Sequence, residues 1–362
     1  MKCTEVKLRD VGHFGECTFN PHEGLNVITG ANGTGKTLLT SVVYNLIRGA
    51  AFNDAGQLTS IAGYFHKSGN SKIQVDYLSS EGGFSLVYPD ETPAGAFGVY
   101  PITARGFVTR LRGSLIDFSQ RGPLSSIVHI SSERGRLIQS AQEVVHGATW
   151  RSAQTMERFS RLRHLLDLIH DLDDGSDQKI DQTLARFFPG MTKLIKVRNA
   201  PSTNLRQADI VSFGKKHEVI SSASGCREIL FIVAETALVS EGVIIIDEPE
   251  GHLHPLAQDM MAKYLEYLAS PEGGNNQVIV STHSLPIIYG GKSGKVFNLR
   301  REDDSIHLDS IIELGIPTIA YESALPELGY SRTAMESWRE LYRDFCKKNN
   351  REENPGGWGW DS

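Results

Sequence analysis

Cysteine and long apolar runs are both scarce in this chain of 362 residues. The four cysteines lie far apart, and no C-x-x-C pair occurs among Cys3, Cys17, Cys226 and Cys346. This usage suits a reducing cytoplasm and gives no support for a zinc site or a disulfide framework. No apolar run approaches the roughly 18 residues of a membrane-spanning helix, and residues 1–5 lack the apolar segment of a signal peptide. We therefore expect a cytoplasmic protein with no membrane partner.

An excess of positive charge is also missing, because 37 Lys and Arg residues stand against 43 Asp and Glu residues. The net charge of −6 argues against a protein that coats nucleic acid over its whole surface. Residues 105–163 reverse this balance, with ten arginines, no lysine and four acidic residues. Arginine without lysine favours bidentate contacts with phosphate or carboxylate. One interpretation is a face that binds DNA or a partner protein through Arg151, Arg158, Arg161 and Arg163. The other is a set of solvated helix faces with internal ion pairs.

The most informative motif lies near the start of the chain, where residues 30–37 match G-x-x-x-x-G-K-[ST]. Residues 25–29 are typical of a strand and residues 37–47 of a helix, which is the context that the phosphate-binding loop requires. Lys36 should contact the β- and γ-phosphates of ATP, and the Thr37 hydroxyl should contact Mg²⁺. The glycines permit close backbone approach to an anion. The rest of the phosphate cradle is predicted to consist of Asn32, Gly33, Thr34 and Gly35.

Two apolar strands with polar ends follow far downstream. Residues 243–246 are expected to form a central parallel strand covered on both faces. Asp247, at its carboxyl end, should hold Mg²⁺ directly or through water, and Glu248 can polarise the attacking water. Residues 278–283 are expected to form the second strand, and His283 at its polar tip is a candidate sensor of the γ-phosphate. The alternatives are a strand that ends in a solvated acidic turn and a histidine with a structural role.

The stretch from Asp247 to Pro255, followed by residues 281–284, resembles the ABC-type P-loop ATPases of the RecF, SMC and OLD group. More narrowly, it is similar to the small prokaryotic ATPases of anti-phage defence systems that are paired with a separate toxin or nuclease. The resemblance implies a homodimer, or a higher oligomer, in which each P-loop faces a signature sequence of the other subunit across ATP. Ser224 and Gly225 occupy the place of that signature. Their surroundings depart from the usual Leu-Ser-Gly-Gly, so an ordinary serine-rich helix start is the alternative. The glutamine loop of the family has no convincing match, and Gln57, Gln74 and Gln120 all stay open.

The fold implied by this resemblance is α/β. We expect an ABC-type ATPase head with a mostly parallel core sheet, an N-terminal antiparallel β region and a short helical insertion. The expected organisation divides the chain at 1–125 (opening strands, P-loop, β-rich region), 126–195 (helical insertion), 196–300 (signature, Asp-Glu strand, His283) and 301–362 (extension with an amphipathic helix and a Gly-rich tail). Within the first part, residues 73–78 and 84–88 alternate as a hairpin.

Two functions of different class are compatible with these features. The first is an ATP-binding and slowly hydrolysing switch, with Mg²⁺ as cofactor, that controls a separate effector nuclease or toxin in antiviral defence. The second is a RecF-like DNA-binding ATPase in repair or recombination, which the arginine segment favours.

Overall fold

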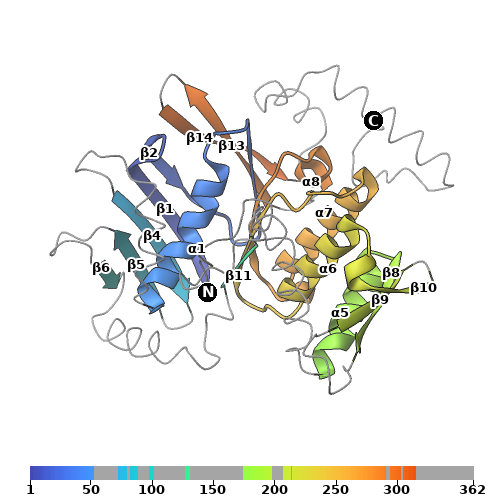
Figure 1. Cartoon of the computed structure of the whole chain (residues 1–362). Helices are drawn as coiled ribbons and strands as arrows, with labels where there is room; N and C mark the ends of the chain where they lie inside the picture. Colours follow the sequence, from blue (N-terminus) through green and yellow to red (C-terminus); the bar gives the residue numbers. More distant parts are fainter. Residues whose placement is uncertain are drawn as a thin grey trace, which may run out of the picture.

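The computed structural model describes residues 1–52, 72–79, 82–88, 98–101, 127–130, 174–197, 207–212, 214–290, 294–302 and 305–314. The described part of the chain contains three sheets, which helices cover (Figure 1). The arginine quartet 151, 158, 161 and 163, most of the predicted insertion, the predicted C-terminal helix, Gln57 and Gln120 lie outside the described residues. In the described part, no helix is long and apolar enough to cross a membrane.

The first sheet is antiparallel, with the strand order β2-β1-β4-β5-β6. Its strands are β1 (Lys2–Val11), β2 (Phe14–Phe19), β4 (Lys72–Ser79), β5 (Gly82–Tyr88) and β6 (Gly98–Pro101). Along β1, buried Val6 and Leu8 alternate with exposed Lys7 and Arg9, which is the pattern of a sheet with one solvated face. The predicted hairpin is confirmed as β4–β5, with Ser79 opposite Gly82 at its turn.

The second sheet is the core, with the order β14-β13-β3-β12-β11-β7. Its strands are β3 (Leu25–Gly30), β7 (Ile127–Ile130), β11 (Val243–Asp247), β12 (Gln277–Ser281), β13 (Gly294–Glu302) and β14 (Ser305–Leu314). Only the β13–β14 pairing is antiparallel. The predicted mostly parallel core is therefore confirmed. The sheet reaches further than the expected boundaries, because β7 and β14 both belong to it.

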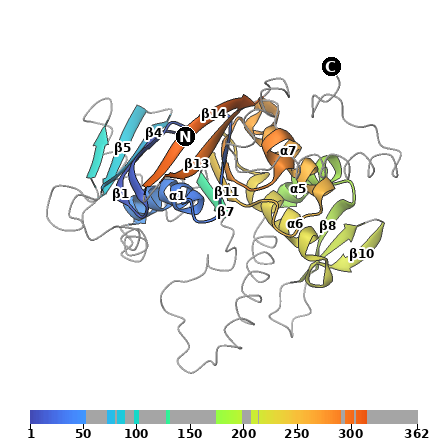
Figure 2. The same cartoon turned by 90° about the horizontal axis from the view of Figure 1, so that it is seen from above.

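The third sheet is a small antiparallel one of order β10-β9-β8, built from β8 (Met191–Val197), β9 (Gln207–Ser212) and β10 (Lys215–Glu218). It packs with α5 (Asp174–Phe187), whose Ile180 and Leu184 are fully buried. Figures 1 and 2 show this sheet and the first sheet at opposite ends of the molecule, with the core sheet between them.

Helices cover both faces of the core sheet. Helix α1 (Lys36–Phe52) packs with the first sheet against one face, where Val243 and Ile245 point. Helices α6 (Ser224–Thr236), α7 (Pro255–Ala269) and α8 (Leu285–Gly290) cover the other face, where Ile244 and Ile246 point. Two short 3₁₀ turns, η3 (Val219–Ser221) and η4 (Pro271–Gly273), complete the described elements. Burial on both sides explains why β11 is apolar at every position before Asp247.

Candidate functional site

The P-loop connects β3 to α1 as a tight turn that only glycine can make at its key positions. Gly30, Gly33 and Gly35 have φ values of 142°, 79° and 81°, which side chains rarely permit. A Cβ atom on Gly30 would lie 2.4 Å from the Leu299 carbonyl oxygen of β13, and one on Gly35 would lie 2.7 Å from the Phe14 ring of β2. The loop is therefore held between its neighbours.

Lys36 is buried at the first position of α1, and its ammonium turns back onto the loop. Its Nζ donates to the carbonyl oxygens of Gly30 at 2.9 Å and Ala31 at 3.0 Å. Burial lowers the pKa of Lys36, while the carboxylates of Glu248, Glu250 and Asp247 raise it. The buried ammonium of Lys36 is thus influenced by the charges of three carboxylates. The next residue, Thr37, is exposed at the helix start.

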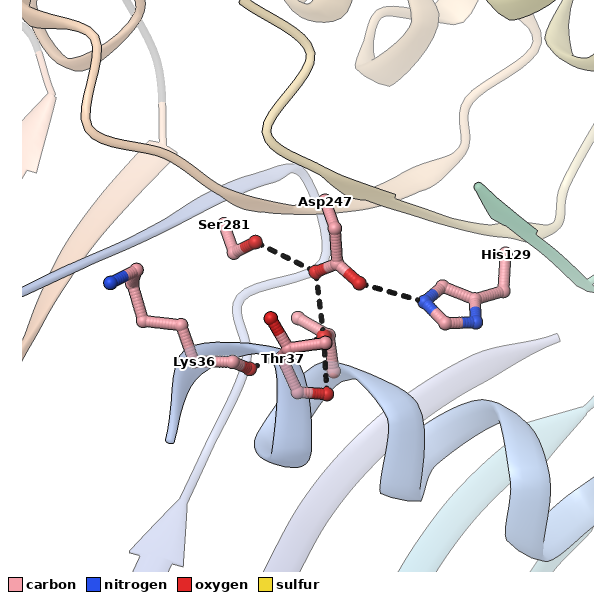
Figure 3. Close-up of polar contacts among 6 residues, drawn as sticks. Lys36, Thr37, His129, Asp247 and Ser281 are labelled. Atoms are coloured by element: carbon pink, nitrogen blue, oxygen red, sulfur yellow. Dashed lines mark hydrogen bonds and ion pairs between the residues drawn. The ribbon is translucent and has the colours of Figure 1, made fainter. Parts of the chain in front are cut away.

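Asp247 is fully buried at the end of β11, and three side chains fix its carboxylate (Figure 3). Oδ1 accepts from the hydroxyls of Thr40 and Ser281, each at 2.7 Å. Oδ2 lies 3.0 Å from Nε2 of His129, which therefore donates to it. The carboxylate is held in one orientation above the start of α1, where Figure 3 shows Lys36 and Thr37.

Glu248 follows with a left-handed backbone, φ 49°. Its N–H donates to the Ser281 carbonyl at 2.7 Å, which extends the β11–β12 ladder by one bond. A non-glycine residue in this conformation costs about 1–3 kcal/mol, and such residues cluster at active sites.

His283 lies two residues past the end of β12, and its N–H donates to Oε1 of Glu250 at 2.7 Å. Burial lowers the pKa of its imidazole, the Lys36 charge lowers it further, and Glu248 opposes them. His283 is therefore expected to be neutral at neutral pH, able to donate one hydrogen bond to an anionic ligand.

Ser224 and Gly225 begin α6, whose N-cap residue Ala223 makes no side-chain capping bond. Ser224 is exposed. A Cβ atom on Gly225 would lie 2.9 Å from the carbonyl oxygen of His252, so glycine lets the helix start approach the loop that follows β11. This end of α6 keeps the amides and the exposed hydroxyl that an anion needs.

The strand order gathers most of the predicted site residues. β3, β12 and β11 are adjacent and parallel, so the P-loop, His283 and the Asp247–Glu248 pair lie at one edge of the sheet. Sequence reasoning missed the partners of Asp247. Thr40 lies one helical turn after Lys36 and could have been found from that spacing, whereas His129 could not, because β7 is far away in the chain.

The side chains of Thr37 and Asp247, which are predicted to bind the metal, have the chemistry that Mg²⁺ prefers. A carboxylate and a hydroxyl are oxygen donors, and Mg²⁺ is bound through one or two protein groups together with substrate phosphates. The described residues contain no cluster of three or more His, Cys, Asp or Glu side chains that could hold a metal ion alone. Gln74, one of the glutamine-loop candidates, lies on β4 and donates to Asp76.

Comparison with known proteins finds similar sequences and similar structures. The model of the AAA ATPase domain family matches residues 137–288. The DNA replication and repair protein RecF of Chloroherpeton thalassium is 29% identical over 119 residues, covering 29% of this chain and 32% of that protein. RecF of Desulforamulus reducens is 38% identical over 52 residues, covering 14% of each chain. The chain thus spans about a third or less of the RecF proteins it matches.

Among solved structures, the SMC head domain from Thermotoga maritima has a TM-score of 0.52 at 12% identity, over 86% of this chain and all of that one. An SMC head bound to the C-terminal winged-helix domain of ScpA has a TM-score of 0.56 at 13% identity, over 87% and 99%. A Pyrococcus furiosus SMC head bound to the C-terminal domain of ScpA gives 0.55 at 12% identity, over 94% and 99%.

The likeness to SMC heads confirms the α/β fold predicted from the sequence, with a mostly parallel core sheet and an antiparallel sheet. The chain is therefore similar in part of its sequence to the AAA ATPase domain family and to RecF proteins, and in fold to SMC heads.

Proposed function

We propose that this chain binds Mg-ATP, dimerises around it, hydrolyses it slowly, and so acts as a switch on a separate effector in prokaryotic antiviral defence. The observation that carries the ATPase part is the strand order β3-β12-β11, which brings the P-loop, His283 and Asp247–Glu248 to one edge.

The residues support hydrolysis in the following way. Lys36 exchanges its two loop carbonyls for phosphate oxygens, and the loop amides cradle the same phosphates. Thr37 and Asp247 would hold Mg²⁺, which would neutralise part of the phosphate charge. Glu248 accepts a proton from the attacking water while the oxygen of that water bonds to the γ-phosphorus. The bond between the γ-phosphorus and the bridging oxygen breaks in line, and ADP leaves with that oxygen. Neutral His283 donates to a γ-phosphate oxygen.

Dimerisation is supported by the exposed start of α6. Ser224, the first residue of α6, is exposed, so a second subunit could offer the γ-phosphate of its own ATP to this helix start. In this arrangement neither subunit completes a site alone. The dimer then closes only when ATP is bound, and hydrolysis reopens it.

The control of an effector nuclease or toxin rests on the resemblance to defence ATPases. A specific observation favours the alternative, a RecF-like ATPase that binds DNA, because both sequence relatives are RecF proteins. Co-purification with the product of the neighbouring gene, with and without Mg-ATP, separates the two. Capture of a nuclease or toxin supports the switch, while a replication protein or DNA supports the alternative.

The ATPase proposal is tested by two substitutions. Lys36→Ala should abolish or sharply weaken ATP binding, because the phosphates lose their main cation. Glu248→Gln should bind Mg-ATP like the wild type, hydrolyse it very slowly and accumulate as a dimer. Nucleotide titration, phosphate release and size-exclusion chromatography measure these outcomes, with Glu16→Gln on the exposed face of β2 as control. Unchanged affinity in Lys36→Ala would contradict the P-loop assignment, and normal turnover in Glu248→Gln would mean that another residue orients the water.

A further inference from the structure

The turn after β11 brings a second glutamate, Glu250, back toward the end of β12. The N–H of Gly251 donates to the Glu248 carbonyl at 3.0 Å, and the N–H of Leu253 donates to the Glu250 carbonyl at 2.9 Å. These two overlapping turns, which start from the left-handed Glu248, fix the backbone of Glu250 before α7 begins at Pro255.

The side chain of Glu250 then links the two loops of the site. Asp247 stands opposite Ser281 in the β11–β12 pair, and one backbone bond joins Glu248 to Ser281 beyond it. The next connection is a side chain, since Oε1 of Glu250 accepts from the N–H of His283 at 2.7 Å. The carboxylate therefore holds the backbone of the residue that we assign to the γ-phosphate.

This carboxylate sits in surroundings that are unfavourable for a charge. Its Oε2 is buried, and the described part of the chain offers it no hydrogen-bond partner. Burial raises the pKa of Glu250, and the nearby charge of Glu248 adds to this shift. Hydrogen bonds from the N–H of His283, from its own N–H and from the Thr282 hydroxyl oppose it. A buried polar atom without a partner costs about 1–3 kcal/mol, so a loop that needed only an anchor would be more stable with a neutral acceptor.

Glu250 also belongs to the electrostatics of the phosphate site. Its carboxylate is one of the three, with those of Glu248 and Asp247, that raise the pKa of Lys36. The residue thus contacts the His283 backbone and acts on the Lys36 charge from the same position.

From these contacts we propose that Glu250 is a positioning residue for hydrolysis, which acts through His283 by holding its backbone so that the imidazole keeps one orientation toward the phosphate site. This inference rests on the ATPase function proposed above.

The test compares acceptor-deleting and acceptor-keeping variants in single-turnover hydrolysis and in ATP binding. Glu250→Ala and the size-matched Glu250→Met should lower the hydrolysis rate by about tenfold to about 100-fold, since a misplacement of about 1 Å costs about 100-fold. ATP binding should not weaken, because both substitutions remove a negative charge from the phosphate site. Glu250→Gln keeps an oxygen that can accept from His283 and should restore most of the rate. Glu272→Ala, an exposed acid in η4, should behave like the wild type.

A double-mutant cycle separates this role from a structural one. His283→Ala should cause a comparable loss, and Glu250→Met combined with His283→Ala should be no slower than His283→Ala alone. Strictly additive losses, or a Glu250→Met rate equal to wild type, would overturn the inference while leaving the ATPase proposal standing. A wild-type protein with no ATP turnover would overturn both.

Discussion

At the scale of single residues, the site is organised around the buried carboxylate of Asp247. Two hydroxyls and one imidazole, from Thr40, Ser281 and His129, donate three hydrogen bonds to it. A buried charge is tolerable only when it is paired in this way. The same bonds fix the direction in which the carboxylate can reach a metal ion, as outer partners of metal ligands do.

His129 should therefore set the Mg²⁺ requirement of ATP binding. His129→Leu removes the donor to Oδ2 and leaves the carboxylate free to turn, so the Mg²⁺ concentration needed for tight ATP binding should rise about tenfold or more. His129→Gln, which keeps an N–H donor, should lie close to the wild type. Nucleotide titrations across Mg²⁺ measure this, with the exposed edge-strand variant His217→Gln as control. Identical Mg²⁺ dependence in His129→Leu would show that Asp247 does not need this partner.

Glu250 should make the folded protein less stable as the pH rises. Its folded pKa is raised by burial above its ordinary value, so the folded state binds more protons than the unfolded state between those two pKa values. The unfolding free energy contributed by this group falls as the pH rises through that window and stays low above it. Glu250→Gln should thus melt at a higher temperature than wild type at neutral pH, and the difference should vanish below the ordinary glutamate pKa. Thermal melts of the nucleotide-free proteins across pH measure how the difference in melting temperature between Glu250→Gln and wild type depends on pH. A Gln variant that is equally destabilised at every pH would contradict this prediction.

At the scale of elements, the start of α6 and the loop after β11 form one unit. Gly225 lets the helix approach the carbonyl of His252, a residue with a left-handed backbone. Since this loop also carries Glu248 and Glu250, a partner ATP bound at α6 would act on the same loop that holds the proposed general base, Glu248. This gives a physical route by which closure of a dimer could reach the chemistry.

Ser224→Arg tests the role of this helix start. A bulky cation in place of the exposed hydroxyl should leave ATP binding at the P-loop largely intact but block dimer closure and turnover. Equilibrium ATP binding, sizing in the Glu248→Gln background and phosphate release are the measurements. When Ser224→Arg and Lys36→Ala subunits are mixed, each dimer with one subunit of each kind should regain at most one functional site. Wild-type turnover and sizing in Ser224→Arg would make α6 an ordinary serine-rich helix start.

At the scale of the whole molecule, the core sheet separates two hydrophobic clusters. One joins the first sheet and α1, and the other joins α5, α6 and α7. Alternate residues of β11 enter each cluster, so the strand that ends in Asp247 is packed from both sides.

The arginines between 105 and 163 bear on the whole molecule because they could bind its partner. If Arg151, Arg158, Arg161 and Arg163 contact nucleic acid, binding should fall steeply with salt, since each neutralised phosphate releases counterions. Replacing all four by alanine should then flatten the salt slope and leave basal ATP turnover unchanged. Filter binding across salt, run beside a partner pull-down, distinguishes DNA from protein. Wild-type behaviour in both assays would assign these arginines to the solvated surface.

The sequence by itself determined the parts of this protein that depend on local chemistry. The glycine pattern of residues 30–35 specifies a left-handed loop, and an apolar run that ends in Asp247–Glu248 specifies a central strand with acids at its tip. Both follow from short-range sterics and burial, so most of the candidate site could be predicted without coordinates. The class of fold was implied by the resemblance of these motifs to the ABC-type ATPases.

Only the tertiary structure decided which distant side chains meet. His129 reaches Asp247 because β7 pairs with β11, and Glu250 reaches His283 because β12 lies beside β11 in register. Neither contact leaves a periodic or spacing signal in the chain, since both depend on strand order and on the pairing of residues more than 30 positions apart. Sheet topology is set by the packing of the whole core, and the positioning of the reactive groups follows from it.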